Sequence, residues 1–181
     1  MANVKLYYLS KTKNILMDNY KSILLELKNK VYRPVYMLMG EESFYIDKII
    51  DFIEKDVLNE QEKEFNLSVV YGMETTVDNV ISMAQRFPMM GNYHLVIVKE
   101  AQNLKKIEKL QSYIKKPSSS TILVLSYKHK TIDKRTVFAK SIPAAKGIVF
   151  NSERIRDYKI PEWIKDYVSL QKFSIDDKTA Q

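Results

Sequence analysis

The chain has 181 residues, 45% of them hydrophobic and 28% charged, which is typical of a folded globular domain. It contains no cysteine, which excludes disulfides, thiolate metal sites and cysteine nucleophiles and fits a reducing, cytoplasmic environment. No apolar run approaches the ~18 residues of a membrane span, so no membrane partner is expected. The formal net charge of +7 suggests an anionic partner, but its meaning depends on where the charge lies.

The charge is unevenly distributed along the chain. Residues 17–98 carry 8 basic and 13 acidic side chains, whereas residues 99–150 carry 12 basic and 3 acidic ones. Residues 1–16 add three lysines and no acid, and residues 151–181 are neutral overall. A basic segment of this kind is either a solvated lysine-rich face or a surface for an anionic partner. A nucleic-acid-binding α/β domain that uses residues 99–150 is therefore the alternative function.

Five short apolar runs alternate with segments of helical periodicity. The predicted strands, in chain order, are 35–39, 67–71, 94–98, 121–125 and 147–150. The predicted helices begin at Met17 and continue with 46–57, 78–86, 104–114 and 133–141, the last with Asp133 as its cap or first-turn acid. This alternation indicates right-handed βαβ units. The predicted fold class is α/β, with a five-stranded parallel sheet flanked by helices.

The two ends of the chain depart from this alternation. Residues 1–16 precede the first amphipathic helix, and we expect an N-terminal extension outside a core domain of residues 17–152. After the last predicted strand, Pro161 marks the first turn of one helix, and Ser174 is a candidate cap for another. We expect residues 153–181 to be the beginning of a small helical domain that is truncated here.

The turn after the first strand is the place to look for a phosphate-binding loop, because ligands of parallel α/β sheets bind at the carboxyl ends of strands. Such a loop needs Gly-x-x-x-x-Gly-Lys-Ser/Thr, since backbone amides and the lysine hold phosphates and the hydroxyl holds magnesium. Aligned on Gly40, this sequence has Tyr45 at the second glycine and Ile46 at the lysine. Asp47 takes the place of the hydroxyl residue. The predicted phosphate loop is therefore degenerate.

The magnesium-binding acid that should follow the third strand is also missing. Lys99 and Glu100 follow that strand, so a lysine stands where an aspartate is needed. We therefore expect no nucleotide cofactor and no catalysis, and a residual nucleotide-dependent enzyme is a third hypothesis that an ATPase assay would test. The histidines, His94 and His129, lack metal-ligand spacing, so no metal site is predicted. We expect His94 at a strand end with a hydrogen-bonded ring.

An apolar segment lies between the helix 78–86 and the third strand. It contains Phe87, Pro88, Met89 and Met90 in succession, where a connecting loop is ordinarily polar. One interpretation is that the phenylalanine and one methionine tuck beneath the sheet. The other is an exposed apolar surface for a partner protein, because methionine adapts to irregular grooves and exposed apolar patches mark interfaces.

Three segments together resemble the DNA polymerase III delta subunit family, which provides the clamp-opening subunit of the bacterial clamp loader. The segments are 34–42, 87–98 and 160–164, and their order and spacing fit the family from residue 17 onward. The resemblance implies a P-loop NTPase-like domain of AAA+ type, followed by a helical lid domain. It also implies a collar domain that contacts the other clamp-loader subunits and is missing from this chain. Contact with DNA would be indirect or weak.

In that family, an apolar pair in the loop before the third strand inserts into a hydrophobic pocket of the sliding clamp, the beta subunit. The loop is commonly of the type Pro-Phe-Phe-Gly. Pro88 and Gly91 match this pattern, Met89 and Met90 replace the aromatic pair, and Phe87 offers aromatic area beside them. The resemblance thus implies a non-hydrolysing subunit that binds the clamp through this loop and helps to open the ring during DNA replication.

Overall fold

A computed structural model of the chain describes residues 15–170, 172–176 and 179. Its centre is a five-stranded parallel sheet with the strand order β2-β3-β4-β1-β5. The strands are β1 (Val35–Gly40), β2 (Leu67–Tyr71), β3 (His94–Lys99), β4 (Thr121–Lys128) and β5 (Ile148–Ser152). Each overlaps a predicted strand, and the predicted α/β class with a five-stranded parallel sheet is confirmed.

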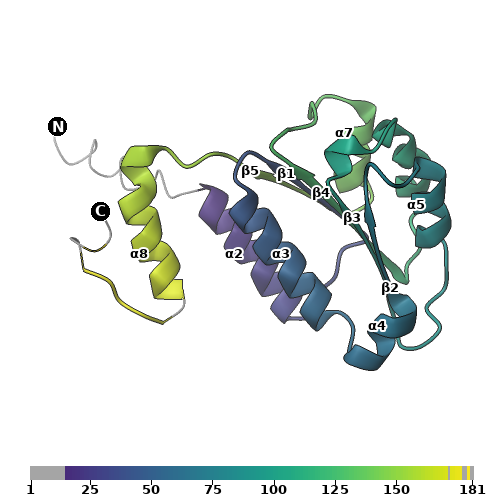
Figure 1. Ribbon diagram of the computed structural model, residues 1–181, viewed down its shortest axis with the longest axis horizontal. Helices are drawn as coiled ribbons and strands as arrows, with labels where there is room; N and C mark the ends of the chain where they lie inside the picture. Colours follow the sequence, from purple (N-terminus) through teal and green to yellow (C-terminus); the bar gives the residue numbers. More distant parts are fainter. Residues whose placement is uncertain (1–14, 171, 177–178, 180–181) are drawn as a thin grey trace.

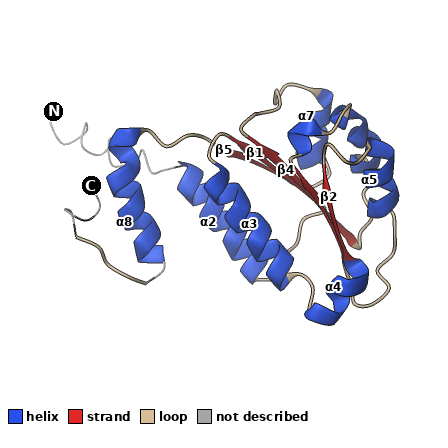
Figure 2. Ribbon diagram, viewed as in Figure 1, coloured by secondary structure: helices blue, strands red, loops and turns tan. Residues whose placement is uncertain are grey.

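Helices cover both faces of this sheet (Figure 1; Figure 2). One face packs against α2 (Ile15–Lys28) and α3 (Ser43–Asp56). The other face packs against α5 (Val77–Ala84), α6 (Gln111–Ile114) and α7 (Val137–Ala144). Because successive strand residues point to opposite faces, each strand supplies side chains to two separate cores. The continuous apolar runs of the sequence follow from this burial on both sides.

Strand β1 shows how the two cores are built. Tyr36 and Leu38 belong to the core beneath α2 and α3, whereas Val35, Met37 and Met39 belong to the core beneath α5 and α7. All five are at most 1% exposed. Fully burying a side chain of this size contributes roughly 1.5–3 kcal/mol, so the central strand is a major source of stability.

The predicted helix over 104–114 forms only in its second half. There a 3₁₀ turn, Ile107–Leu110, leads into α6, and another 3₁₀ turn, Ala101–Asn103, precedes the predicted start. Lys106, between the two turns, has a φ of 60°, in the left-handed region that a right-handed helix cannot contain. The apolar spacing nevertheless reflects burial, because Leu104, Leu110 and other residues of the segment pack into the core beneath α5.

The predicted start of the helix over 133–141 also differs from the structure. Thr136 caps α7 by accepting a hydrogen bond from the Ala139 N–H, so the helix begins later than predicted and Asp133 is not its cap. Asp133 instead accepts hydrogen bonds from the Arg135 guanidinium. The helix predicted from Ser174 falls mainly on residues outside the described part of the chain, so it remains a prediction.

Two helices lie outside the simple strand–helix alternation. The first is α4 (Glu60–Asn66), which the sequence reasoning missed and which leads directly into β2. The second is α8 (Ile160–Leu170), which follows a 3₁₀ turn at Asp157–Lys159 and confirms the helix predicted after Pro161. None of the helices in the described part of the chain is long and apolar enough to cross a membrane.

An aromatic cluster attaches α8 to the start of α3. The Trp163 ring meets the Phe44 ring edge-on at 5.6 Å, and its Nε1–H donates to the Tyr45 hydroxyl. Tyr167 stacks on Trp163 with ring centroids 5.7 Å apart. Helix α8 consequently lies beside α2 and α3 (Figure 1). The assignment of residues 153–181 to a lid domain remains a prediction.

The N-terminal boundary is a prediction as well. Helix α2 begins at Ile15, two residues before the predicted start. Its Leu16 packs against the core beneath α2 and α3. Most of the predicted extension, residues 1–14, lies outside the described residues.

Candidate functional site

The apolar segment 87–90, here called the apolar loop, joins α5 to β3. Because it precedes β3, it lies at the amino end of the parallel sheet, opposite the carboxyl ends where a nucleotide would bind. Phe87 is 84% exposed, Met89 is 76% exposed and Met90 is 47% exposed, while Pro88 is half-buried. Of the two interpretations of this segment, the structure shows the exposed one.

The backbone of the apolar loop is held by Asn66, the last residue of α4. The Asn66 side chain is completely buried, and its Oδ1 accepts a hydrogen bond from the Met89 N–H at 2.8 Å. Its Nδ2 donates to the Met90 carbonyl oxygen. One backbone N–H and one backbone carbonyl of the loop are therefore bonded to a buried side chain, while both methionines are exposed.

Helix α4 is itself anchored by a capping box, which was visible in the sequence as Asn59 followed three residues later by Glu62. The Asn59 side chain accepts from the Glu62 N–H at 2.9 Å, and the Glu62 carboxylate accepts from the Asn59 N–H at 2.9 Å. This reciprocal pattern is a sequence signature for a helix start. It could have revealed α4, although not the contact between α4 and the apolar loop.

Gly91 closes the apolar loop against α4. Its φ is +70°, a conformation that costs a non-glycine residue roughly 1–2 kcal/mol. A Cβ at this position would also overlap the Glu62 carboxylate. The backbone conformation therefore favours glycine, and a larger residue would also displace the Glu62 side chain from its present position.

His94 begins β3, just after the apolar loop, as predicted. It is 3% exposed, and its Nε2 lies 3.3 Å from the Ser68 hydroxyl, so the expected hydrogen-bonded ring is confirmed. Burial lowers the pKa of His94 below its usual value, and the positive charge of Arg86 lowers this pKa further. The neutral imidazole is the form that the folded chain favours.

Acidification is expected to destabilise the folded chain through His94. The unfolded chain takes up this proton at a pH near the ordinary histidine pKa, about 6.5, whereas the folded chain resists it. The free energy of unfolding should therefore fall as the pH drops from about 7.5 to about 5. Urea titrations at several pH values should show a weaker pH dependence for His94→Gln than for the wild type. An equal dependence in both proteins would contradict this prediction.

At the opposite end of the sheet, Gly40 closes β1 in a position that is crowded by backbone. Its φ is +129°, and a Cβ there would overlap the Ser152 carbonyl group. Its N–H donates to the Lys130 carbonyl oxygen, and its own carbonyl oxygen accepts from the His129 N–H at 2.8 Å. The packing of β1 against neighbouring backbone thus explains this glycine without any phosphate.

The remaining positions of the degenerate phosphate loop are occupied by the protein itself. Glu42 caps α3, with its carboxylate accepting from the Phe44 N–H at 3.2 Å. Tyr45 and Ile46 are both completely buried, and burial raises the pKa of Tyr45 to about 12. The carboxylate and the two buried side chains take up the start of α3, where a bound phosphate would need free amides and a lysine.

The last position of the degenerate phosphate loop and the two positions of the degenerate magnesium site have partners within the protein. Asp47, at the hydroxyl position of the loop, forms an ion pair of 2.5 Å with Lys128 at the end of β4. At the magnesium site, the backbone carbonyl oxygen of Lys99 accepts from the Gly72 N–H at 2.8 Å, and the Glu100 carboxylate accepts a hydrogen bond from the Asn103 side chain. Within the described residues, no group of three or more histidine, aspartate or glutamate side chains is arranged to hold a metal ion.

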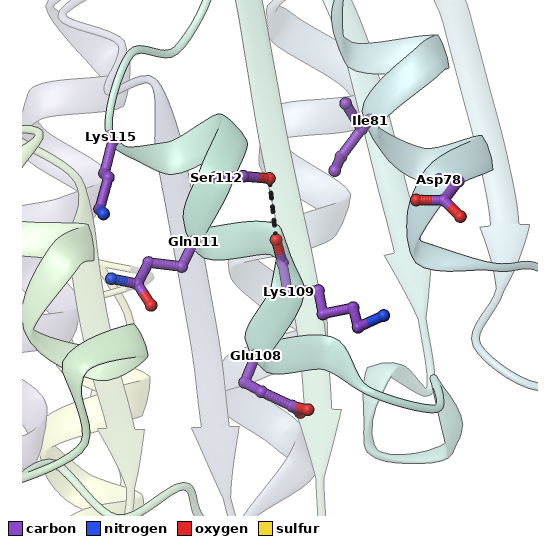
Figure 3. A pocket seen from close by; sticks show the side chains of 7 residues that line it. All are labelled: Asp78, Ile81, Glu108, Lys109, Gln111, Ser112 and Lys115. Carbon is purple, nitrogen blue, oxygen red and sulfur yellow. Dashed lines mark hydrogen bonds between the residues drawn. The ribbon is translucent and has the colours of Figure 1, made fainter.

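Two hollows lie away from the phosphate turn. The larger, of about 530 Å³, lies between α5 and the turn preceding α6 (Figure 3). Its charged side chains include both acidic and basic ones, and the Ser112 hydroxyl donates a hydrogen bond to the Lys109 carbonyl oxygen at 3.0 Å. The other is near the amino end of the sheet, between Tyr32 and Tyr93. Neither hollow is lined by residues of the degenerate phosphate loop.

The five-stranded parallel sheet with helices on both faces defines a three-layered α/β domain. Residues 36–151 match the family described as "DNA polymerase III, delta subunit". The chain therefore belongs to the DNA polymerase III delta subunit family. This confirms the resemblance that the three sequence segments indicated.

Two relatives show how much of the family this chain represents. It is 35% identical over 138 residues to the DNA polymerase III subunit delta of Bacillus subtilis (strain 168). This match covers 71% of this chain and 39% of that protein. The solved structure of the Bacillus subtilis DNA clamp loader delta protein superimposes with a TM-score of 0.75 at 26% identity, covering 89% of this chain and 50% of that one. The chain thus spans half or less of each relative's length.

Proposed function

We propose that this chain is part of a clamp-loader subunit that binds the DNA polymerase sliding clamp through the apolar loop and helps to open the ring during replication. The family membership supports a place in clamp loading. The observation that carries the proposal is the exposure of Phe87, Met89 and Met90 on a loop whose backbone is hydrogen-bonded to a buried side chain.

The physical argument concerns the area that these side chains present. Exposed apolar groups gain roughly 25 cal/mol for each Å² that a partner removes from water. A rigid loop also loses little conformational freedom on binding, which lowers the entropic cost of association. Thioether side chains adapt to the shape of an apolar pocket, so Met89 and Met90 can replace aromatic residues as anchors.

Binding can open a ring without nucleotide hydrolysis if the subunit prefers the open or strained clamp over the closed one. The buried Tyr45 and Ile46 and the Asp47–Lys128 ion pair support the inference that this chain neither binds nor hydrolyses ATP. In this proposal, the ring is opened by the difference in binding free energy between the open and the closed clamp.

The test is a titration of this chain with the cognate sliding clamp, labelled by a fluorescence donor and acceptor across one subunit interface of the ring. We expect saturable binding and a loss of energy transfer without any nucleotide. We also expect no phosphate release when ATP is added to the chain alone. Failure to bind the clamp would contradict the proposal, as would ring opening that requires ATP bound by this chain.

The remaining partners follow from the same proposal. Contacts with other clamp-loader subunits would be made by the part of the relatives that this chain does not span. The compartment would be the cytoplasm, where replication proteins of this family work.

The alternative function, nucleic-acid binding through residues 99–150, gains no specific support from the topology. Lys105 and Lys130 follow strand ends at the carboxyl side of the sheet, whereas Lys115 and Lys146 precede strands at the amino side. The two groups are separated by the length of the strands. Strong and steeply salt-dependent binding to primed DNA would favour this alternative over the clamp-binding proposal.

A further inference from the structure

Asn66 is unusual among the buried polar residues that the structure describes. It is completely removed from solvent, yet both its amide oxygen and its amide nitrogen bond to the backbone of the apolar loop, 23 and 24 residues away along the chain. By contrast, the buried Ser126 hydroxyl in β4 has no hydrogen-bond partner within the protein. The Asn66 amide therefore has a specific structural task at this position.

The Asn66 side chain pairs with the loop backbone as a neighbouring peptide group does in a β-sheet. An asparagine side chain carries one carbonyl acceptor and an NH₂ donor, so it can pair with a backbone N–H and a backbone C=O as another peptide group would. Here it pairs with the N–H of Met89 and the carbonyl of Met90. Both backbone groups face Asn66, while Met89 and Met90 are themselves exposed.

We infer that Asn66 is a positioning residue for partner binding: it pre-orders the Met89–Met90 backbone so that both thioethers are presented together. This inference rests on the proposed function, because it concerns how the same loop reaches its partner. Asn66 itself would not touch the partner. Without it, the loop would have to be ordered during binding, and the affinity would fall by the conformational cost of that step.

The first test needs no variant. Amide hydrogen exchange of the wild-type chain, free of any partner, should show the Met89 amide protected although the residue is 76% exposed. Exchange of this amide at the rate of an unstructured peptide would overturn the inference. This measurement is independent of clamp binding and therefore of the proposed function.

The second test uses Asn66→Leu, which keeps a similar side-chain volume and removes both hydrogen bonds. We expect faster exchange at the Met89 amide and a clamp affinity about 10- to 30-fold weaker than that of the wild type. Ser126→Ala is the control, since it alters another buried polar side chain, in β4, that makes no hydrogen bond to the loop. Wild-type affinity in a folded Asn66→Leu variant would overturn the inference.

A mutant cycle distinguishes positioning from general destabilisation. If Asn66 acts through Met89, the affinity lost on Asn66→Leu should be smaller in a Met89→Ala background than in the wild type. An equal loss of clamp affinity in both backgrounds would show that Asn66 does not act through Met89. If removing both methionines leaves clamp binding intact, the proposed function itself fails. If that removal abolishes binding while Asn66→Leu does not weaken it, only the positioning role fails.

Discussion

Replacing both Met89 and Met90 by alanine is expected to weaken binding to the sliding clamp by about 100-fold or more. Anchor residues at the centre of an interface typically contribute at least ~2 kcal/mol each, and 1.4 kcal/mol corresponds to a tenfold change in affinity. The free energy of unfolding should change by no more than about 0.5 kcal/mol, because both side chains are exposed. Calorimetric titration with the clamp and urea unfolding measure the two quantities.

Met73 provides a matched control for this experiment. It is 77% exposed, about as much as Met89, but it lies in the turn after β2 at the opposite end of the sheet. Met73→Ala should bind the clamp as the wild type does. For the aromatic neighbour, Phe87→Ala can be compared with Phe173→Ala, since Phe173 is also largely exposed. A double methionine variant with undiminished affinity would remove the apolar loop from the mechanism.

Placing a lysine at Ile46, the position of the phosphate-loop lysine, is expected to destabilise the fold by about 3 kcal/mol or more instead of creating a nucleotide site. Ile46 is completely buried in the core beneath α2 and α3. An ammonium group there loses its hydration, and the deleted isoleucine loses its packing. Urea or thermal unfolding of Ile46→Lys should therefore show a markedly lower midpoint, and ATP should not raise it.

Asp51→Lys is the control for introducing a lysine into α3, because Asp51 is exposed on the same helix. Its stability should stay within about 0.5 kcal/mol of the wild type. An Ile46→Lys variant that unfolds at the wild-type midpoint and is stabilised by ATP would show that the turn after β1 retains room for phosphate. That result would contradict the inference that the buried side chains at the start of α3 exclude a nucleotide.

Local prediction succeeded where burial alone sets the pattern. The apolar runs of β1 and β3 are continuous because both faces of these strands are covered, and this signal survives without knowledge of the strand order. It failed where a single backbone angle decides. The left-handed conformation of Lys106 interrupts a segment whose apolar residues have helical spacing. A lysine gives no sequence signal for this conformation, which glycine and asparagine favour. Helix α4 was missed although the Asn59–Glu62 capping pattern was present.

The sequence by itself determined which residue types are present in the turn after β1 and in the apolar loop. It showed that the phosphate turn lacks its lysine and that four apolar residues precede β3. Only the tertiary structure decided that Phe87, Met89 and Met90 are exposed, and it placed Asn66, distant along the chain, against the backbone of the two methionines. The opposite holds at α3, where packing against the core places Ile46 out of reach of any ligand. Exposure depends on such long-range contacts, which short-range periodicity does not contain.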